Sequence, residues 1–415
     1  MKKIAFHTFG CKLNFSESSE ILKQFVENHY ENVDFSEKAD VYVINTCCVT
    51  AVAEKKCRTA IRQALRQNPN AIVAVVGCMS QLSAEEIRKI NGVSIVLGND
   101  KKHTLFETVK NKEQGATNKD DMAQENEHPY PKMTFFSSTS SSDRTRVFMK
   151  IQDGCDYFCA YCTIPFARGQ NRCDSIENIV KRIKNERERG VKEIVLTGIN
   201  IGEFGDKSFF DLIKKIDGLI PRYRISSIEP NLITDEMIEF IARSASFLPH
   251  FHIPLQSGNN KILDLMKRRY KRENFADRVF KIKQEMPNAF VAADVIVGFP
   301  QETDEDFEDT YRFIDSLPLA FLHIFPFSER PNTLAAKMTG KISPEAKKIR
   351  AKRLQELSDR KHREFIESQK GRVFSVLWEA ENHNGQMGGW SENYIHLHKA
   401  YDENSVNEIE NYTLN

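Results

Sequence analysis

The hydrophobic pattern changes twice along the chain, and these changes divide it into three regions. In the first region, short apolar runs rich in β-branched residues alternate with longer stretches that have helical spacing of apolar residues. These runs cover residues 4–9, 41–45, 71–77 and 93–97. The alternation is typical of parallel α/β folds, so we predict a small parallel α/β domain over residues 1–110.

The second region repeats this alternation after a polar interruption. Residues 111–142 lack a periodic apolar pattern and are rich in Ser, Asn, Asp and Lys, which predicts a linker. Beyond it come six strand candidates followed by helical stretches, at residues 147–152, 193–196, 224–227, 250–254, 291–297 and 321–325. Six such units predict an incomplete parallel barrel over residues 143–366, which ends in a charged helix from about residue 343 to 368.

The third region, residues 367–415, changes to period-two alternation with glycine-rich turns. This pattern is typical of a small all-β module. The fold class is therefore α/β, with an N-terminal parallel domain, a central partial barrel of six β/α units and a C-terminal β-barrel module.

Composition narrows the function classes. Of the 415 residues, 40% are hydrophobic, and no apolar run approaches the roughly 20 residues that a membrane-spanning helix needs. Met1, Lys2 and Lys3 lead directly into a strand-like segment rather than a signal sequence, so we expect a cytoplasmic protein. The net charge of +1 gives no global basic field, and any nucleic-acid binding has to rest on local patches.

Three cysteines directly follow the first strand of the central series, in the stretch "GCDYFCAYC". They are Cys155, Cys159 and Cys162. In parallel α/β folds the working site lies at the carboxyl ends of the strands, which is where this loop falls. Structural zinc takes four Cys or His ligands, and the nearest further candidate is Cys173. The set favours a [4Fe–4S] cluster whose fourth iron stays open, with zinc as the alternative.

Three more cysteines follow successive strands of the first domain, namely Cys11, Cys47 and Cys78. A single cysteine at a strand end is usually a small buried hydrophobe, but three at one sheet edge predict a second cluster site. Because neighbouring side chains on a strand point in opposite directions, only one of Cys47 and Cys48 should face this site. We assign Cys47, which is nearer the strand end, and expect structural roles for Cys48, Cys57 and Cys173.

Other strand ends carry polar or glycine-rich sequence suited to a bound cofactor. Glycines let a ligand approach the backbone closely, and a carboxylate such as Glu229 accepts hydrogen bonds from a ribose. The alternative is that each glycine only turns the chain. The expected cofactor contacts are Tyr161, Thr197, Gly198, Asn200, Glu229, Gln256 and Gly298.

Stretches from almost the whole chain resemble the methylthiotransferases of the radical S-adenosylmethionine (SAM) superfamily. They include "TFGCKLNFSES", "INTCCVT", "VVGCMSQ", "GCDYFCAYCTIPFARG", "SSIEP", "HIPLQSGNNKILDLMKRRY" and "DVIVGFPQETDEDFE". "CTIPFARG" and "LTGINIGEFG" are most similar to the MtaB branch, which acts on N6-threonylcarbamoyladenosine in tRNA. Gln301 and Asn332 depart from the family pattern, because the family usually has glycine at these positions.

The resemblance implies a fold, two [4Fe–4S] clusters, SAM and a reaction. It implies a flavodoxin-like first domain that binds an auxiliary cluster, a radical SAM core and a TRAM-like RNA-binding module. SAM at the open iron of the core cluster would yield a 5′-deoxyadenosyl radical, which takes hydrogen from carbon 2 of the adenine. The auxiliary cluster would supply a sulfur methylated by another SAM. The implied partners are the anticodon loop of tRNA, modified at position 37, and a reductant such as flavodoxin or ferredoxin.

Basic residues in two places are the candidate RNA contacts. They are Lys267, Arg268, Arg269, Lys271, Arg272, Lys370 and Arg372. The acidic tail of the last module works against a phosphate surface there. Alternative functions are methylthiotransfer to isopentenyladenosine in tRNA or to a ribosomal protein and, in another class, a non-catalytic metal-containing RNA-binding protein.

Overall fold

The computed structural model describes residues 1–115, 131, 133–140, 145–205 and 208–414, which form two compact units. The first unit comprises Met1–Ser142, Phe148–Cys173 and Glu329–Thr333, and the second comprises the rest of the chain. Within the described residues, no helix is both long and apolar enough to cross a membrane. The predicted domain boundaries remain predictions, and most of the predicted linker, at residues 116–130, 132 and 141–142, lies outside the described residues.

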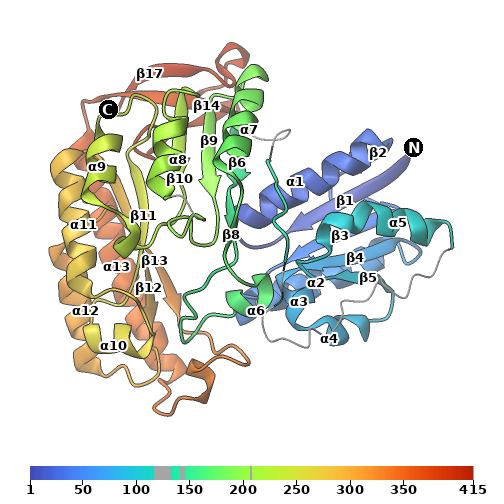
Figure 1. Ribbon diagram of the computed structural model, residues 1–415, viewed down its shortest axis with the longest axis horizontal. Coiled ribbons are helices and arrows are strands. Elements are labelled where there is room, and N and C mark those ends of the chain that lie inside the picture. The colour runs from blue at the N-terminus through green and yellow to red at the C-terminus, as the bar shows by residue number, and fades with distance from the viewer. Residues whose placement is uncertain (116–130, 132, 141–144, 206–207, 415) are drawn as a thin grey trace. The chain divides into compact units, whose positions relative to one another are not determined.

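The first unit is built on one parallel sheet with the strand order β2-β1-β3-β4-β5 (Figure 1). Its strands are β1 (Lys2–Thr8), β2 (Tyr30–Val33), β3 (Val41–Thr46), β4 (Ile72–Gly77) and β5 (Val93–Leu97). The sheet confirms the predicted parallel α/β fold. The edge strand β2 was not predicted, because its sequence YENV lacks the apolar run that marks the other four.

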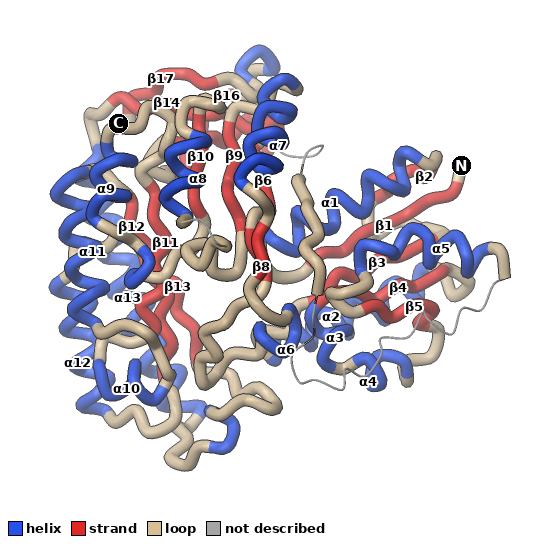
Figure 2. The backbone as a smooth tube through the Cα atoms, in the orientation of Figure 1, coloured by secondary structure: helices blue, strands red, loops and turns tan. Residues whose placement is uncertain are grey.

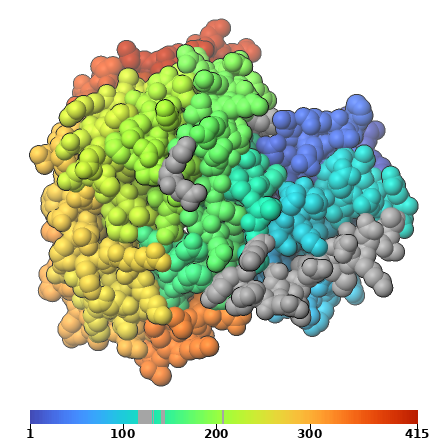
Figure 3. All heavy atoms as spheres, in the orientation of Figure 1, coloured from blue at the N-terminus to red at the C-terminus, as the bar shows by residue number. Residues whose placement is uncertain are grey.

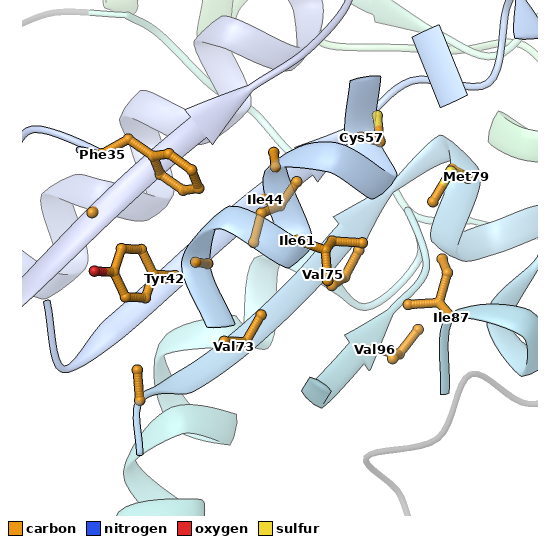
Figure 4. Close-up of a cluster of buried hydrophobic side chains, with 14 of the residues drawn as sticks. Phe35, Tyr42, Ile44, Cys57, Ile61, Val73, Val75, Met79, Ile87 and Val96 are labelled. Carbon is orange, nitrogen blue, oxygen red and sulfur yellow. The ribbon is translucent and has the colours of Figure 1, made fainter. Parts of the chain in front are cut away.

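Helices cover both faces of this sheet. They are α1 (Lys12–Glu27), α2 (Ala51–Gln67), α3 (Cys78–Leu82), α4 (Ala84–Arg88), the short 3₁₀ helix η1 (Lys102–Thr104) and α5 (Leu105–Glu113). On one face, Cys57 and Ile61 of α2 pack against Ile44 and Val75 of the sheet (Figure 4). On the other, α1 buries Ile21 and Phe25. The apolar faces of these helices thus hold the sheet between two cores.

The segment with the second cysteine motif belongs to the first unit. It contains the end of β6 (Arg146–Lys150), β7 (Gln152–Asp153), α6 (Ile164–Arg168) and β8 (Arg172–Cys173). Part of the predicted linker is ordered beside it, since Thr139 forms an antiparallel bridge with Met149 and the Ser138 hydroxyl lies 2.9 Å from that of Ser16.

Apart from β6, most of which belongs to the first unit, the strands of the predicted barrel lie in the second unit. They form two three-stranded sheets, ordered β10-β9-β6 and β11-β12-β13, with parallel pairing of β9 to β10 and of β12 to both its neighbours. The bounds are β9 (Glu193–Thr197), β10 (Arg222–Ile225), β11 (His250–Gln256), β12 (Phe290–Val297) and β13 (Phe321–Pro326). The partial six-stranded arrangement agrees with the prediction.

Helices flank these strands (Figure 2). They are α7 (Ile176–Glu188), α8 (Phe209–Ile216), η3 (Pro230–Leu232), α9 (Asp235–Ala242), α10 (Asn260–Leu265), α11 (Arg272–Glu285), α12 (Asp304–Ser316), η4 (Ala335–Lys337) and α13 (Pro344–Gln369). The charged helix predicted near the end of the core is α13.

A curled antiparallel sheet with the order β16-β15-β14-β17 ends the chain. Its elements are β14 (Val373–His383), β15 (Gln386–Ser391), β16 (His396–Ala400), η5 (Glu403–Ser405) and β17 (Ile409–Thr413). Figure 3 shows this module in red along one edge of the second unit. Trp378 is fully buried in its core, so this aromatic fills the module rather than facing a ligand.

Two buried arginines join the module to the barrel strands. Arg222 and Arg224 of β10 both form ion pairs with Glu193 of β9, at 2.9 and 2.8 Å. Arg222 also donates to the Trp390 carbonyl and Arg224 to the Ser391 carbonyl, at 2.9 and 2.7 Å. Burial alone would raise the pKa of Glu193, but Arg224 and Arg222 hold this pKa below its ordinary value.

We predict that Glu193→Gln lowers the free energy of unfolding by about 3–5 kcal/mol, because it leaves two buried guanidinium groups without their carboxylate. Urea unfolding at neutral pH measures the change. The control is Glu408→Gln, whose carboxylate pairs with Lys192 at the surface and whose loss should cost at most about 1 kcal/mol. Equal effects of the two substitutions would contradict the anchoring role of Glu193.

Candidate cysteine and cofactor site

Cys11, Cys47 and Cys78 follow the three adjacent parallel strands β1, β3 and β4. Cys11 is the N-cap of α1, and Cys78 is the first residue of α3. Because adjacent parallel strands end at the same sheet edge, the three cysteines follow strands that end at one edge; that they hold a cluster stays a prediction.

Two glycines make this close approach of the strand ends feasible. Gly10 and Gly77, directly before Cys11 and Cys78, both have a φ of +98°, which favours glycine. A Cβ at Gly10 would lie 3.1 Å from the Cys47 sulfur, and one at Gly77 would lie 2.5 Å from Oδ1 of Asn45. A side chain at Gly10 would therefore crowd Cys47, and one at Gly77 would crowd Asn45 and Thr46.

The side chain of Asn99 is hydrogen-bonded to the sulfur of Cys78. Its Nδ2 donates to the Cys78 sulfur at 3.3 Å and to the Ala167 carbonyl at 2.8 Å, and its Oδ1 accepts from Nζ of Lys102 at 2.7 Å. Hydrogen bonds to a ligating sulfur are one of the means by which proteins tune iron–sulfur clusters.

The protein environment separates the pKa values of these thiols. A hydrogen bond from Cys48 lowers the pKa of Cys78 to about 5, assisted by the charges of Arg168 and Lys102. Burial raises the pKa of Cys47 to about 12. Metal binding at Cys47 therefore has to displace a proton, whereas Cys78 is prepared to be a thiolate.

The second motif, Cys155, Cys159 and Cys162, lies on the loop after β7. The amide of Tyr157 donates to the Cys155 sulfur at 3.5 Å, and the amide of Ile164 donates to the Cys162 sulfur at 3.4 Å. The loop is closed at its base because the Cys155 amide donates to the Gly169 carbonyl at 3.2 Å. Backbone donors aimed at two of the sulfurs suit thiolate ligands.

Residues next to the two cysteine sets are in contact within the first unit. The sulfur of Cys48, next to Cys47, lies 3.6 Å from Oγ1 of Thr163, which is next to Cys162. Asn99 makes a second link, because it bonds to both Cys78 and the Ala167 carbonyl of α6. The two sites are therefore neighbours in one folded unit.

A buried network of charges lies beneath both sets. Glu17 of α1 accepts from Lys150 at 2.7 Å, from Arg168 at 3.1 Å and from Lys102. Asp153 accepts from Lys150 at 2.6 Å and from Arg168 at 2.9 Å. These five side chains are at most 2% exposed. Burial alone would raise the pKa of Glu17, but Arg168, Lys102 and Lys150 hold it below its ordinary value.

The donor chemistry fits iron–sulfur clusters. All nine cysteines lie in the described part of the chain and are thiols rather than disulfides. No three His, Cys, Asp or Glu side chains among the described residues are grouped so that they could hold a single metal ion. A cubane binds each cysteine to a different iron, so it needs thiols spread around it rather than converging on one point.

The remaining expected cofactor contacts differ in their surroundings. Thr197 ends β9 and is buried, and its Oγ1 has no hydrogen-bond partner among the described residues; the same holds for Oγ of Ser226, just past β10. Such unsatisfied hydroxyls at carboxyl strand ends suit a polar ligand. The amide of Gly298 instead donates to Glu302 at 2.6 Å, which fits the alternative that this glycine turns the chain.

The other cofactor candidates are placed as follows. Tyr161 is half-buried on the cysteine loop, and Gly198 is half-buried just past β9. Asn200 is buried and donates to Glu203 at 3.1 Å, and Gln256 ends β11 with a φ of +65°. Glu229 is ion-paired with Arg268, and burial raises its pKa.

The basic run after Gln256 is largely paired with carboxylates. Arg268 is only 3% exposed in its pair with Glu229. Arg269 pairs with Glu203, Lys271 with Asp264, Arg272 with Asp309 and Lys370 with Glu367, whereas Lys267 and Arg372 are exposed. Arg268 therefore does not offer a solvent-facing guanidinium, and RNA contact by this run stays a prediction.

Sequence reasoning missed two sets of residues. One is the buried network around Glu17, whose members come from distant segments. The other crosses three barrel strands: Nε2 of His252 lies 2.7 Å from Asp294, and its Nδ1 lies 3.0 Å from Ser227. "SSIEP", "HIPLQSG" and "DVIVGFP" each carried one member, but only the strand order brings them together.

Two family models match parts of the chain. Residues 3–98 match a model described as "Uncharacterized protein family UPF0004", and residues 149–314 match the radical SAM superfamily. The matched ranges contain the first and the second cysteine set respectively.

Two relatives are similar over almost their full length. The threonylcarbamoyladenosine tRNA methylthiotransferase MtaB of Bacillus subtilis is 40% identical, with 99% of this chain and 93% of that protein covered. The protein of the same name from Aquifex aeolicus is 38% identical, with coverages of 95% and 96%. Among solved structures, the radical SAM methyltransferase TsrM of Kitasatospora setae aligns with a TM-score of 0.58 and 12% identity over 93% of this chain and 80% of that one, a likeness of fold.

We predict that Glu17→Gln lowers the free energy of unfolding at neutral pH by about 3–5 kcal/mol, because it leaves buried cations uncompensated. The charge of Glu17 stabilises the fold above its unfolded pKa of about 4.3, and this contribution is lost as the pH falls toward the lower folded pKa. The variant should therefore lose less stability than the wild type on acidification. Urea titrations at several pH values measure both effects.

Glu27→Gln is the matched control on the same helix. Glu27 is exposed, and its ion pair with Lys23 is a long surface pair of 3.9 Å. The substitution should change stability by at most about 1 kcal/mol and leave the acid dependence unchanged. A wild-type acid profile in the Glu17 variant would show that the network does not stabilise the fold.

Proposed function

The chain belongs to the threonylcarbamoyladenosine tRNA methylthiotransferases of the radical SAM superfamily, and from this premise we propose how its residues carry the reaction. The enzyme converts N6-threonylcarbamoyladenosine in tRNA to its 2-methylthio derivative. We assign the modified nucleoside to position 37, next to the anticodon, and the reaction to the cytoplasm, where tRNA is used.

The six cysteines divide into two ligand sets. Cys155, Cys159 and Cys162 hold the [4Fe–4S] cluster that binds SAM, and Cys11, Cys47 and Cys78 hold the auxiliary cluster. When bound, these cofactors supply the radical that activates carbon 2 of the adenine and the methylated sulfur that replaces its hydrogen. The protein orients the ligands, keeps water away and balances their charge.

Particular residues carry these supporting tasks. The amides of Tyr157 and Ile164 and the side chain of Asn99 donate to three of the ligand sulfurs, which stabilises them as thiolates. Lys102 orients Asn99 through its Oδ1. Thr197 stays an expected cofactor contact, with a buried hydroxyl at the end of β9 that lacks a partner among the described residues. An electron from a low-potential protein such as flavodoxin or ferredoxin starts each turnover.

The observation that carries this assignment is the contact between residues that neighbour the two cysteine sets. A carbon radical has to meet the sulfur before it reacts with anything else, so the two cofactors must be neighbours. The 3.6 Å separation of Cys48 and Thr163, each adjacent to a ligand of a different cluster, supports such a neighbourhood.

Mass spectrometry of tRNA nucleosides tests the function. Cells in which this chain is the sole methylthiotransferase should contain 2-methylthio-N6-threonylcarbamoyladenosine, and cells without it should accumulate the unmethylthiolated nucleoside. Sequencing of the modified tRNA checks position 37. The assignment would be contradicted if the deletion removed only the isopentenyladenosine product. It would also be contradicted if the enzyme acted on a ribosomal protein and not on tRNA.

We predict that Cys47→Ala and Cys48→Ala behave differently. After anaerobic reconstitution the wild type should hold roughly eight irons and Cys47→Ala roughly four, because one cubane loses a ligand. Cys48→Ala is the matched control: its thiol is equally buried but is assigned no iron, so the variant should keep the wild-type iron content. Iron and sulfide analysis with electron paramagnetic resonance measures both, and the reverse result would move the ligand to Cys48.

A further inference from the structure

Helix α2 presents an exposed face that is strongly basic. Its 17 residues contain Glu54 as their acidic residue, whereas the basic ones are Lys55, Lys56, Arg58, Arg62 and Arg66. By contrast, the long helix α13 carries charges of both signs, and its Arg350, Arg353 and Arg360 are paired with carboxylates. Charged side chains of both signs on one helix are usually just solvated. Side chains of one sign create a potential that attracts groups of the opposite charge.

The geometry of α2 separates this basic face from its buried one. At 3.6 residues per turn, Lys55, Arg62 and Arg66 fall on one stripe, together with Thr59. Cys57 and Ile61 fall on the opposite side and pack into the core of the sheet (Figure 4). The core thus fixes the helix so that the basic stripe faces solvent.

The cations on this stripe are not neutralised by the protein. Within the described residues, Lys55, Lys56, Arg62 and Arg66 have no ion-pair partner, and all four are exposed. Glu54 forms an ion pair with Arg330. Among the basic residues of the helix, Arg58 is the one with an ion-pair partner in the described part of the chain, Glu86 at 2.5 Å. Arg62 and Arg66 also line a shallow groove of about 470 Å³ with Thr59, Gln63 and Gln67.

The helix starts next to the candidate auxiliary site. Its N-cap, Thr50, lies three residues after Cys47, and its hydroxyl accepts from the Ala53 amide at 3.1 Å. From Lys55 to Arg66 the stripe extends for about 16 Å along the helix axis. A polyanion whose reacting group reaches the cysteines would therefore find a line of cations leading away from them.

We propose that the exposed basic face of α2, formed by Lys55, Lys56, Arg62 and Arg66, is a docking surface for the phosphate backbone of the substrate tRNA. This inference rests on the proposed function. Arginine and lysine contacts to phosphates supply affinity and register without reading sequence, which suits an enzyme whose chemistry is directed at one nucleoside. The positive N-terminal end of the α2 dipole adds to the attraction nearest the cysteines.

The test compares tRNA binding by the full-length protein and by Arg62→Gln/Arg66→Gln at several salt concentrations. The probe is total tRNA from cells that lack this enzyme. The variant should bind more weakly, and its plot of log affinity against log salt should be shallower by about 2, because about one phosphate contact is lost per residue. Arg62→Lys/Arg66→Lys keeps the charge and should retain most of the affinity.

The matched control is Lys348→Gln/Lys352→Gln on α13, where two exposed lysines have the same spacing along a helix. It makes the same change in net charge and should leave the salt dependence of binding as in the wild type. All these positions are exposed, so the urea midpoints should be unchanged; if the double Gln variant does not fold, the single variants Arg62→Gln and Arg66→Gln should each reduce the slope by about 1.

The outcomes separate the two proposals. If the wild type binds no tRNA, the proposed function fails. If the wild type binds tRNA with a steep salt dependence and the α2 variants bind identically, the docking surface is wrong. If the variants bind tRNA normally but accept electrons more slowly from an acidic flavodoxin, with unchanged reduction by dithionite, the face serves the reductant and the tRNA proposal is overturned.

Discussion

The arrangement of the first unit depends on one buried carboxylate. Glu17 lies on α1, yet its partners Lys102, Lys150 and Arg168 come from three other segments of the chain. An ionised carboxylate is stable in the interior only when such partners surround it, and each cation needs the carboxylate in return. The network therefore specifies one way of packing the second cysteine motif, which precedes Arg168, against the sheet that bears the other cysteines.

This packing explains how cysteines that are far apart in the sequence are held in one folded unit without disulfide bonds. Arg168 lies at the end of α6, just after the cysteine loop, and it donates to both Glu17 and Asp153. Asn14, one turn before Glu17, accepts from Arg168 and donates to the Phe9 and Thr46 carbonyls, which precede Cys11 and Cys47. One helix thus connects the ends of two strands to the second cysteine motif.

Local patterns in the sequence were sufficient to predict the repeated strands and the cysteines at their ends. Long apolar runs identified four of the five strands in the first sheet, and the cysteines at their ends indicated a common edge because parallel strands share one. The strand β2 escaped because a short edge strand with the sequence YENV buries too little to show alternation. Contacts between distant segments escaped for another reason: nothing local distinguishes Glu17, Lys102 or Lys150 from surface charges, and only the tertiary fold buries them. The ion pairing of Arg268 with Glu229 was hidden in the same way, since a run of basic residues looks alike whether its partners are phosphates or carboxylates.

The charge balance of the network gives a physical reason for its position. Its cations are Lys102, Lys150 and Arg168, whereas its anions are Glu17 and Asp153, so three positive charges face two negative ones. An excess of one buried positive charge is costly unless other negative charge is nearby. The thiolates of the proposed ligand sets provide that charge, and Asn99 connects it directly, because it accepts from Lys102 and donates to the Cys78 sulfur. The same cations that tie the segments together therefore also favour the anionic, metal-binding form of Cys78, so that folding of this unit and loading of its cofactors stabilise each other.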